Sequence, residues 1–198
     1  GFCDEVKETA NSLLIPKDYM YEHFNDVMYQ LVGMELDYIE SVSYEMWDEM
    51  VAETTDEIMN RCRNVLPFGL IIGKWKCAID YGNGVSASGS ALYNADGKIV
   101  QQGIIAQANP EDGMVARTSF KFEGDYAIRV GEFYFIGLTL RDVEMRDVSR
   151  EPNDFSVEIL SSLEDYYNGY MGEMEKDVFT LFQANRFEQG SFKCVREE

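Results

Sequence analysis

Residues 72–107, IGKWKCAIDYGNGVSASGSALYNADGKIVQQGIIAQ, decide the fold of this chain. Apolar and polar residues alternate along three runs that are separated by glycine-containing turns. Period-two alternation predicts strands, and Asn94–Gly97 predicts a hairpin turn because Asp and Gly tolerate positive φ. We therefore predict strands over 72–81, 85–93 and 98–107, antiparallel to one another because their connections are short.

The strand pattern continues along most of the remaining chain. Further alternating runs lie at 115–122, 126–130 and 132–148, with turn residues at 109–113 and 123–125. The pattern returns near the end of the sequence, at 178–182 and 192–196. These runs predict an antiparallel meander sheet.

Two glycines, Gly89 and Gly103, lie inside predicted strands. Glycine in a strand interior is typical of a bulge or a bend, so we expect the sheet to curl and to have a concave face. Neither glycine opens a helix after a strand, and the sequence therefore predicts no phosphate-binding loop.

Helical periodicity replaces the strand pattern in two places. The first third has apolar residues at three- and four-residue steps, which predict a helical segment of two to three helices over 1–68. The rest, 69–198, is predicted to be an antiparallel β domain with one helix over 154–173 before the last strands. The fold class is therefore α+β, with the sheet curled or closed as a barrel.

The chain is strongly acidic, with a formal net charge of −19 and a pI near 4.3. Residues 1–66 alone contain fifteen Asp and Glu against four Lys and Arg. Such charge repels phosphate backbones and anionic membrane surfaces, so nucleic acid is excluded as a partner. No apolar run approaches the length of a membrane span, and we expect no membrane insertion. The acidic segment is interpreted as solvated helix faces, with a docking surface for a basic protein partner as the alternative.

Four cysteines lack the CxxC spacing of zinc and thioredoxin-type sites. Four cysteines allow three pairings, and we favour Cys3 with Cys62 and Cys77 with Cys194 because each pair joins the ends of one structural segment. Disulfides form in oxidising compartments, so we expect a periplasmic or extracellular protein. A sequence beginning at Gly1 rather than Met is consistent with a removed signal peptide.

The sequence predicts no catalytic residue, metal site or cofactor. His23 is the only histidine, which excludes a Ser-His-Asp triad and a His-rich metal site. Two acidic clusters lack the spacing of a calcium loop; they are Glu35, Asp37 and Glu40, and Asp142, Glu144 and Asp147. A carboxylate-dependent hydrolase remains an alternative, because sequence does not reveal the distance between two acids.

Gly73-Lys74-Trp75 opens the first predicted strand, and Arg196 lies in the last. In this respect residues 70–196 resemble the lipocalin-like barrels of the calycin group, in which a tryptophan of the first strand packs under a late arginine. The resemblance implies that Trp75 and Arg196 close one end of a barrel, and that Cys77 and Cys194 join its first and last strands. The alternative is an open sheet curled around the predicted helix, with Trp75 an ordinary core residue.

The leading functional hypothesis is an exported, non-enzymatic binding or interaction protein. Its curled sheet would enclose an apolar pocket for a small apolar molecule or a protein partner. The predicted lining consists of four strand aromatics, Phe120, Phe122, Phe133 and Phe135. The alternatives are the hydrolase and an acidic docking or inhibitory module for a basic protein partner. The sequence leaves the oligomeric state open.

Overall fold

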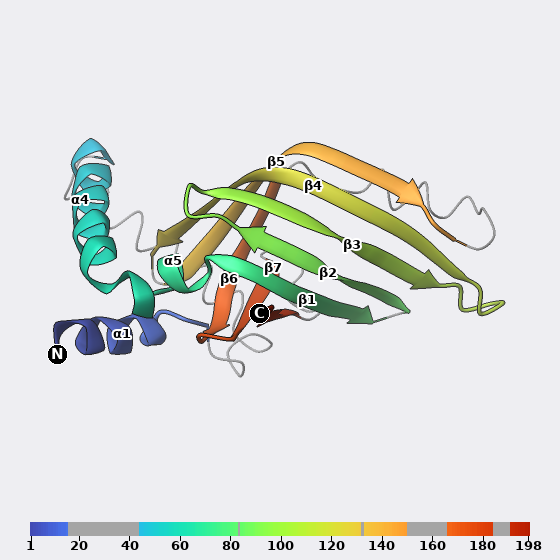
Figure 1. The fold of residues 1–198 in the computed structure, drawn as a ribbon, viewed down its shortest axis with the longest axis horizontal. Helices are drawn as coiled ribbons and strands as arrows, with labels where there is room; N and C mark the ends of the chain where they lie inside the picture. Colours follow the sequence, from blue (N-terminus) through green and yellow to red (C-terminus); the bar gives the residue numbers. More distant parts are fainter. Residues whose placement is uncertain (16–43, 83, 132, 150–165, 184–190) are drawn as a thin grey trace.

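A computed structural model describes residues 1–15, 44–82, 84–131, 133–149, 166–183 and 191–198 (Figure 1). The helices are α1 (Phe2–Ser12), α4 (Tyr44–Cys62), the short 3-10 helix η1 (Arg63–Val65) and α5 (Pro67–Leu70). The strands are β1 (Gly73–Gly82), β2 (Val85–Tyr93), β3 (Lys98–Ala108), β4 (Val115–Val130), β5 (Tyr134–Asp147), β6 (Tyr166–Met174), β7 (Val178–Gln183) and β8 (Ser191–Arg196).

The eight strands form a closed antiparallel barrel in chain order. Closure is made by β1 and β8, where Trp75 lies opposite Arg196 and Cys77 opposite Cys194. The α+β class and the barrel are therefore confirmed, and the open-sheet alternative is wrong. A strand order that follows the chain requires only short hairpin connections, as the turn sequences indicate.

The predicted strands agree closely with the observed ones, with one exception in β4. A turn was predicted at 123–125, but β4 runs through it. The register against β5 shifts between Glu123 and Gly124, so that Arg141 is an extra residue on β5. Gly124 is required there because a side chain would collide with the backbone of Thr139. The turn-like residues therefore lie opposite a β-bulge in β5, which bends the strands without ending them.

Gly89 and Gly103 lie directly opposite each other on β2 and β3. A Cβ at either position would overlap the backbone of the other strand. The register is continuous through this pair, so the glycines permit a close approach and a bend instead of a bulge. The predicted curvature is confirmed, and it belongs to a sheet that closes.

The predicted helix over 154–173 is wrong for its second half, because residues 166–173 form most of β6. Its first half, residues 154–165, lies outside the described residues. Tyr170 and Met171 are adjacent and face opposite sides of the strand, yet both are buried. A strand that is covered on both faces loses its period-two alternation, and its aromatic spacing then resembles a helical stripe.

The helices α1 and α4 confirm part of the helical segment predicted over 1–68. Residues 16–43 of the predicted helical segment lie outside the described residues, and His23, Glu35, Asp37 and Glu40 are among them. In α4, Met46 and Met50 follow the helical apolar spacing from which inward-facing residues are expected, but both are more than half exposed, so that expectation is wrong for them. α4 extends away from the barrel, and these two methionines lie outside the core that the barrel and the described helices share (Figure 1). None of the helices in the described ranges is long and apolar enough to cross a membrane.

The helical segment covers one end of the barrel, which we call the near end. Ala10, Cys62 and Leu66 join the interior side chains of the strands in one hydrophobic core. The backbone amide of Tyr134 donates to Leu13, and that of Ile15 donates to Met171, which ties the chain after α1 to two strands. A domain boundary at 68/69 would fall inside α5, and it stays a prediction.

Candidate functional site

The near end is held by Trp75 and Arg196. Trp75 is fully buried, and the guanidinium of Arg196 lies over its ring, 4.1 Å from the centroid. Phe179 packs edge-on against the same indole at 4.6 Å between centroids. The stacking of Trp75 under Arg196, which the resemblance implied, is therefore present in the structure.

The same two side chains satisfy three successive backbone carbonyls where the helical segment enters β1. The Trp75 indole N–H donates to Ile71 at 2.7 Å. The Arg196 guanidinium donates to Ile72 at 2.9 Å and to Leu70 at 2.5 Å. Gly73 has a φ of 130°, and a Cβ there would lie 2.5 Å from Arg196 Nη1. The Gly-x-Trp sequence thus leaves room for the arginine that caps this junction.

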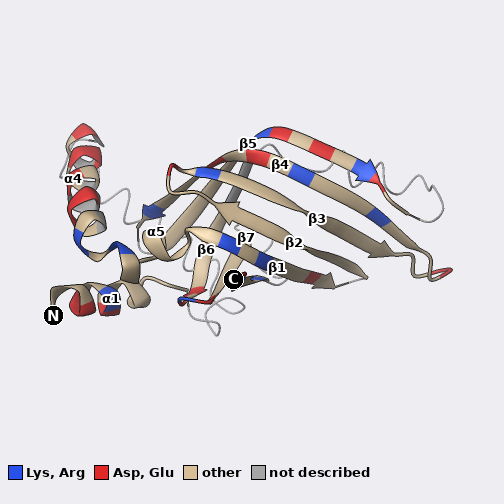
Figure 2. Ribbon diagram, viewed as in Figure 1, with Lys and Arg blue, Asp and Glu red and all other residues tan. Residues whose placement is uncertain are grey.

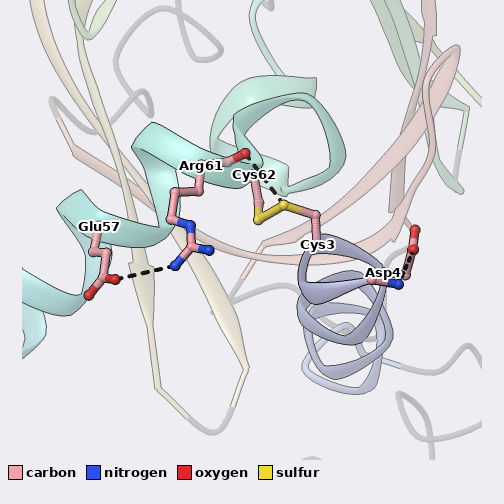
Figure 3. Close-up of a disulfide and its surroundings, with 6 residues drawn as sticks. Cys3, Asp4, Glu57, Arg61 and Cys62 are labelled. Atoms are coloured by element: carbon pink, nitrogen blue, oxygen red, sulfur yellow. Dashed lines mark hydrogen bonds and ion pairs between the residues drawn. A yellow bond between two sulfur atoms is a disulfide. The ribbon is translucent and has the colours of Figure 1, made fainter.

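Both predicted disulfides are present. Cys77 is bonded to Cys194, which joins the first and last strands inside the barrel wall. Cys3 is bonded to Cys62, which fastens α1 to the C-terminal end of α4 (Figure 3). The two bonds therefore fix closure of the barrel and attachment of its helical cover separately.

Burial at the near end also raises the pKa values of its tyrosines. Burial raises the pKa of the Tyr93 phenol well above its usual range, with a smaller contribution from Tyr126. Burial likewise raises the pKa of Tyr134 to about 12. The Tyr126 hydroxyl donates to the Asn94 carbonyl at 2.7 Å. These phenols are neutral structural groups at physiological pH.

The strand register identifies the side chains that face the barrel interior. On β1, Trp75 and Cys77 are buried while Lys76 between them is exposed. Residues directly opposite one another in antiparallel strands point to the same face. Two lines of opposed residues therefore face inward; they are Cys77, Gly89, Gly103, Phe120 and Met145, and Trp75, Ala91, Gln101, Phe122 and Val143.

The interior changes character toward the other end, which we call the distal half. Phe120 and Phe122 face inward on β4 with stacked rings, 6.1 Å between centroids. Both rings are only partly buried, and Val143, which also faces inward, is 42% exposed. These three inward-facing apolar side chains therefore keep contact with solvent, unlike the fully buried Trp75 and Phe179 at the near end.

The four predicted lining residues do not share one surface. Phe120 and Phe122 lie together in the distal half, as described above. Phe133 is buried beside the turn between β4 and β5, at the near end. Phe135 is on the outer face of β5, where its ring lies 5.0 Å from that of Tyr170. A ligand-binding role remains a prediction for all four, and the geometry supports it for the first pair.

One polar residue in the distal half was missed from the sequence. Thr118 faces inward two residues before Phe120, is fully buried, and its hydroxyl has no hydrogen-bond partner. A buried hydroxyl without a partner is costly, and such groups often mark a position that a ligand or water satisfies. A threonine in an alternating strand gives no sequence signal of this kind.

The acidic cluster of β5 does not converge on one point. Asp142 and Glu144 lie on the outer face, and Asp147 lies opposite the inward-facing Thr118. Within the part of the chain that the structure describes, no group of three His, Cys, Asp or Glu residues is arranged to hold a metal ion.

No protein-family model and no curated protein matches this sequence. Among solved structures, the barrel is similar to a lipocalin-like protein from Bacteroides uniformis. The two are 13% identical, the match covers 65% of this chain and 100% of that chain, and the TM-score is 0.37. The lipocalin-like resemblance of this chain stands on its closed eight-stranded barrel and on the stacking of Trp75 under Arg196.

Proposed function

We propose that this protein is an exported, non-enzymatic binding protein that holds a small, largely apolar molecule in the distal half of its barrel. The observation that carries the proposal is the pair of stacked, partly exposed rings of Phe120 and Phe122 on the inner face. Small-molecule sites are mostly apolar concave surfaces with a few placed polar groups. The buried hydroxyl of Thr118 supplies one such group beside the rings.

Export is supported by the chemistry of the cysteines. All four are consumed in two disulfides, each of which joins segments far apart in the sequence. Such bonds persist in oxidising compartments. No contact among the described residues favours the hydrolase or the basic-partner module, so neither is proposed.

Titration with a hydrophobic fluorescent probe tests the proposal. Phe122→Ala should weaken probe binding at least about tenfold, because a buried aromatic contact contributes on the order of 1.5–3 kcal/mol. Phe135→Ala is the matched control, because it removes the same ring from the outer face of the barrel. Equal binding by the wild type and Phe122→Ala, with both folded by circular dichroism, would contradict the proposal.

Thr118→Val tests the polar contact separately. The substitution keeps the shape of the side chain and removes a hydroxyl that has no partner, so the stability of the empty protein should not fall. Binding of a probe that carries a hydroxyl or carbonyl group should weaken, while binding of a hydrocarbon probe of similar size should not. A loss for both probes would assign Thr118 a packing role only.

A further inference from the structure

Within the described residues, the distal part of β5 has one edge that pairs with no other strand. β5 pairs with β4 along its length, but it pairs with β6 only from Phe135 to Thr139. Among the described strands, none pairs with the other edge of Leu140–Asp147. Figure 1 shows this part of β5 along the margin of the barrel. An open edge presents unpaired backbone donors and acceptors that another strand can bind.

This edge is accessible and carries charges of both signs. Every residue from Arg141 to Val148 is exposed except Met145, which is half-buried. Figure 2 shows acidic residues lying between basic ones along this part of the strand. Neither the Asp142 carboxylate nor the Arg146 guanidinium makes an ion pair with any described residue. Two accessible charges of opposite sign on one edge are thus available to a partner.

The charged residues of this edge are complementary to those of the same edge on a second copy of the chain. When two such edges pair antiparallel about a two-fold axis at Glu144, Asp142 lies opposite Arg146 of the second copy, and Arg146 opposite its Asp142. The same register places Val143 opposite Met145, both of which face inward. Opposed residues then also share a face, because inward and outward positions alternate with period two.

Neighbouring registers fit less well. An axis at Val143 would set Asp142 opposite Glu144, two like charges. An axis at Met145 would set the apolar Val143 opposite Asp147. In the register centred on Glu144, the two glutamates meet at the axis, each beside Lys121 of the adjoining β4 strand. Protective edges commonly rely on charge alone, most often lysine, whereas this edge has a self-complementary order.

We propose that the β5 edge over Leu140–Asp147 is a self-association surface, on which a second copy of this chain adds its own β5 edge to form a sheet continuous across two barrels. Two short edges bury less than the roughly 1,200 Å² at the lower limit of standard interfaces, so the dimer should dissociate on dilution.

Sedimentation velocity over a range of protein concentrations, at physiological ionic strength, tests this surface with a charge swap. The wild type should show a reversible monomer–dimer equilibrium. Asp142→Arg and Arg146→Asp each turn two attractive pairs into repulsive ones, and each should weaken association about tenfold or more. The double variant with both substitutions restores opposite charges and should restore the dimer. A monomeric wild type at every concentration, or a double variant no tighter than the single ones, would overturn the proposal.

Cysteine crosslinking tests the register independently. All native cysteines are in disulfides, so Glu144→Cys adds one free thiol at the proposed axis. Mild oxidation should convert this variant to a covalent dimer. Ser88→Cys, exposed on β2, is the matched control and should stay monomeric. Crosslinking through Met145→Cys but not through Glu144→Cys would overturn the register, and equal crosslinking of Glu144→Cys and Ser88→Cys would overturn the surface.

Discussion

The two ends of the barrel contain similar kinds of side chain in different surroundings. At the near end, Trp75 and Phe179 are fully buried, and the helical segment covers them. In the distal half, Phe120 and Phe122 also face inward but keep contact with solvent. A filled and capped interior stabilises the fold, whereas inward-facing rings that contact solvent offer an apolar surface to a ligand. This difference assigns stability to the near end and supports the proposal that a ligand binds in the distal half.

The largest effect that separates the ends should be on the free energy of unfolding. Trp75→Ala should cost about 3–5 kcal/mol, because it leaves a cavity in a packed core and removes the platform of Arg196. Phe122→Ala should cost less, about 1–2 kcal/mol, because the ring is only partly buried. Chemical denaturation of both variants under non-reducing conditions measures the difference. Similar losses would remove the distinction between the ends.

The disulfides should come next in effect. Replacing Cys77 and Cys194 together by alanine should cost about 2–4 kcal/mol. Replacing Cys3 and Cys62 should cost about 0.6 kcal/mol less, since its loop, with a sequence separation of 59 against 117, is about half as long. Thermal or urea unfolding of the two double variants compares them. The opposite order would show that attachment of the helical cover stabilises the fold more than barrel closure does.

The smallest effect is a loss of unfolding free energy at alkaline pH, and it arises from Tyr93 at the near end. The pKa of Tyr93 is raised by burial, so the folded state keeps this phenol neutral after the unfolded chain has begun to ionise near pH 10. Its contribution is fully present below that pH and is lost as pH rises. Between pH 9 and 11 the wild type should lose about 1.4 kcal/mol through this group. Tyr93→Phe should lose less over the same interval, as measured by urea unfolding at each pH; an unchanged loss would contradict the assignment.

Local sequence patterns predicted the parts of the fold that alternation and turn chemistry determine. Both ends of β2 were predicted correctly. Both disulfides were predicted because each cysteine pair lies at the two ends of one structural segment. The prediction of barrel closure depended on the resemblance carried by Gly73, Trp75 and Arg196. Local periodicity does not encode closure, because closure is a contact between the two ends of the β region.

The errors arose where tertiary contacts override local pattern. Residues 166–173 form a strand because both faces of β6 are covered. Residues 123–125 continue β4 because β5 accommodates them with an extra residue, Arg141, on the opposite strand. The sequence grouped Phe135 with Phe120, and the structure places Phe135 on the outer face and Phe120 on the inner one; a ligand-binding role stays a prediction for both. The bulge at Arg141 shifts the inward positions of β5 by one residue, and this shift is invisible in the sequence of either strand alone.

The most direct test of the account is to locate a bound apolar molecule. Photolabelling with a small hydrophobic diazirine, followed by peptide mapping, reports which residues lie against it. The account predicts labelling in the distal half, on β4 around Phe120 and Phe122 and on β5 around Met145. Labelling of α4 or of the near end around Trp75, with the distal residues unlabelled, would contradict the assignment of binding to the distal half.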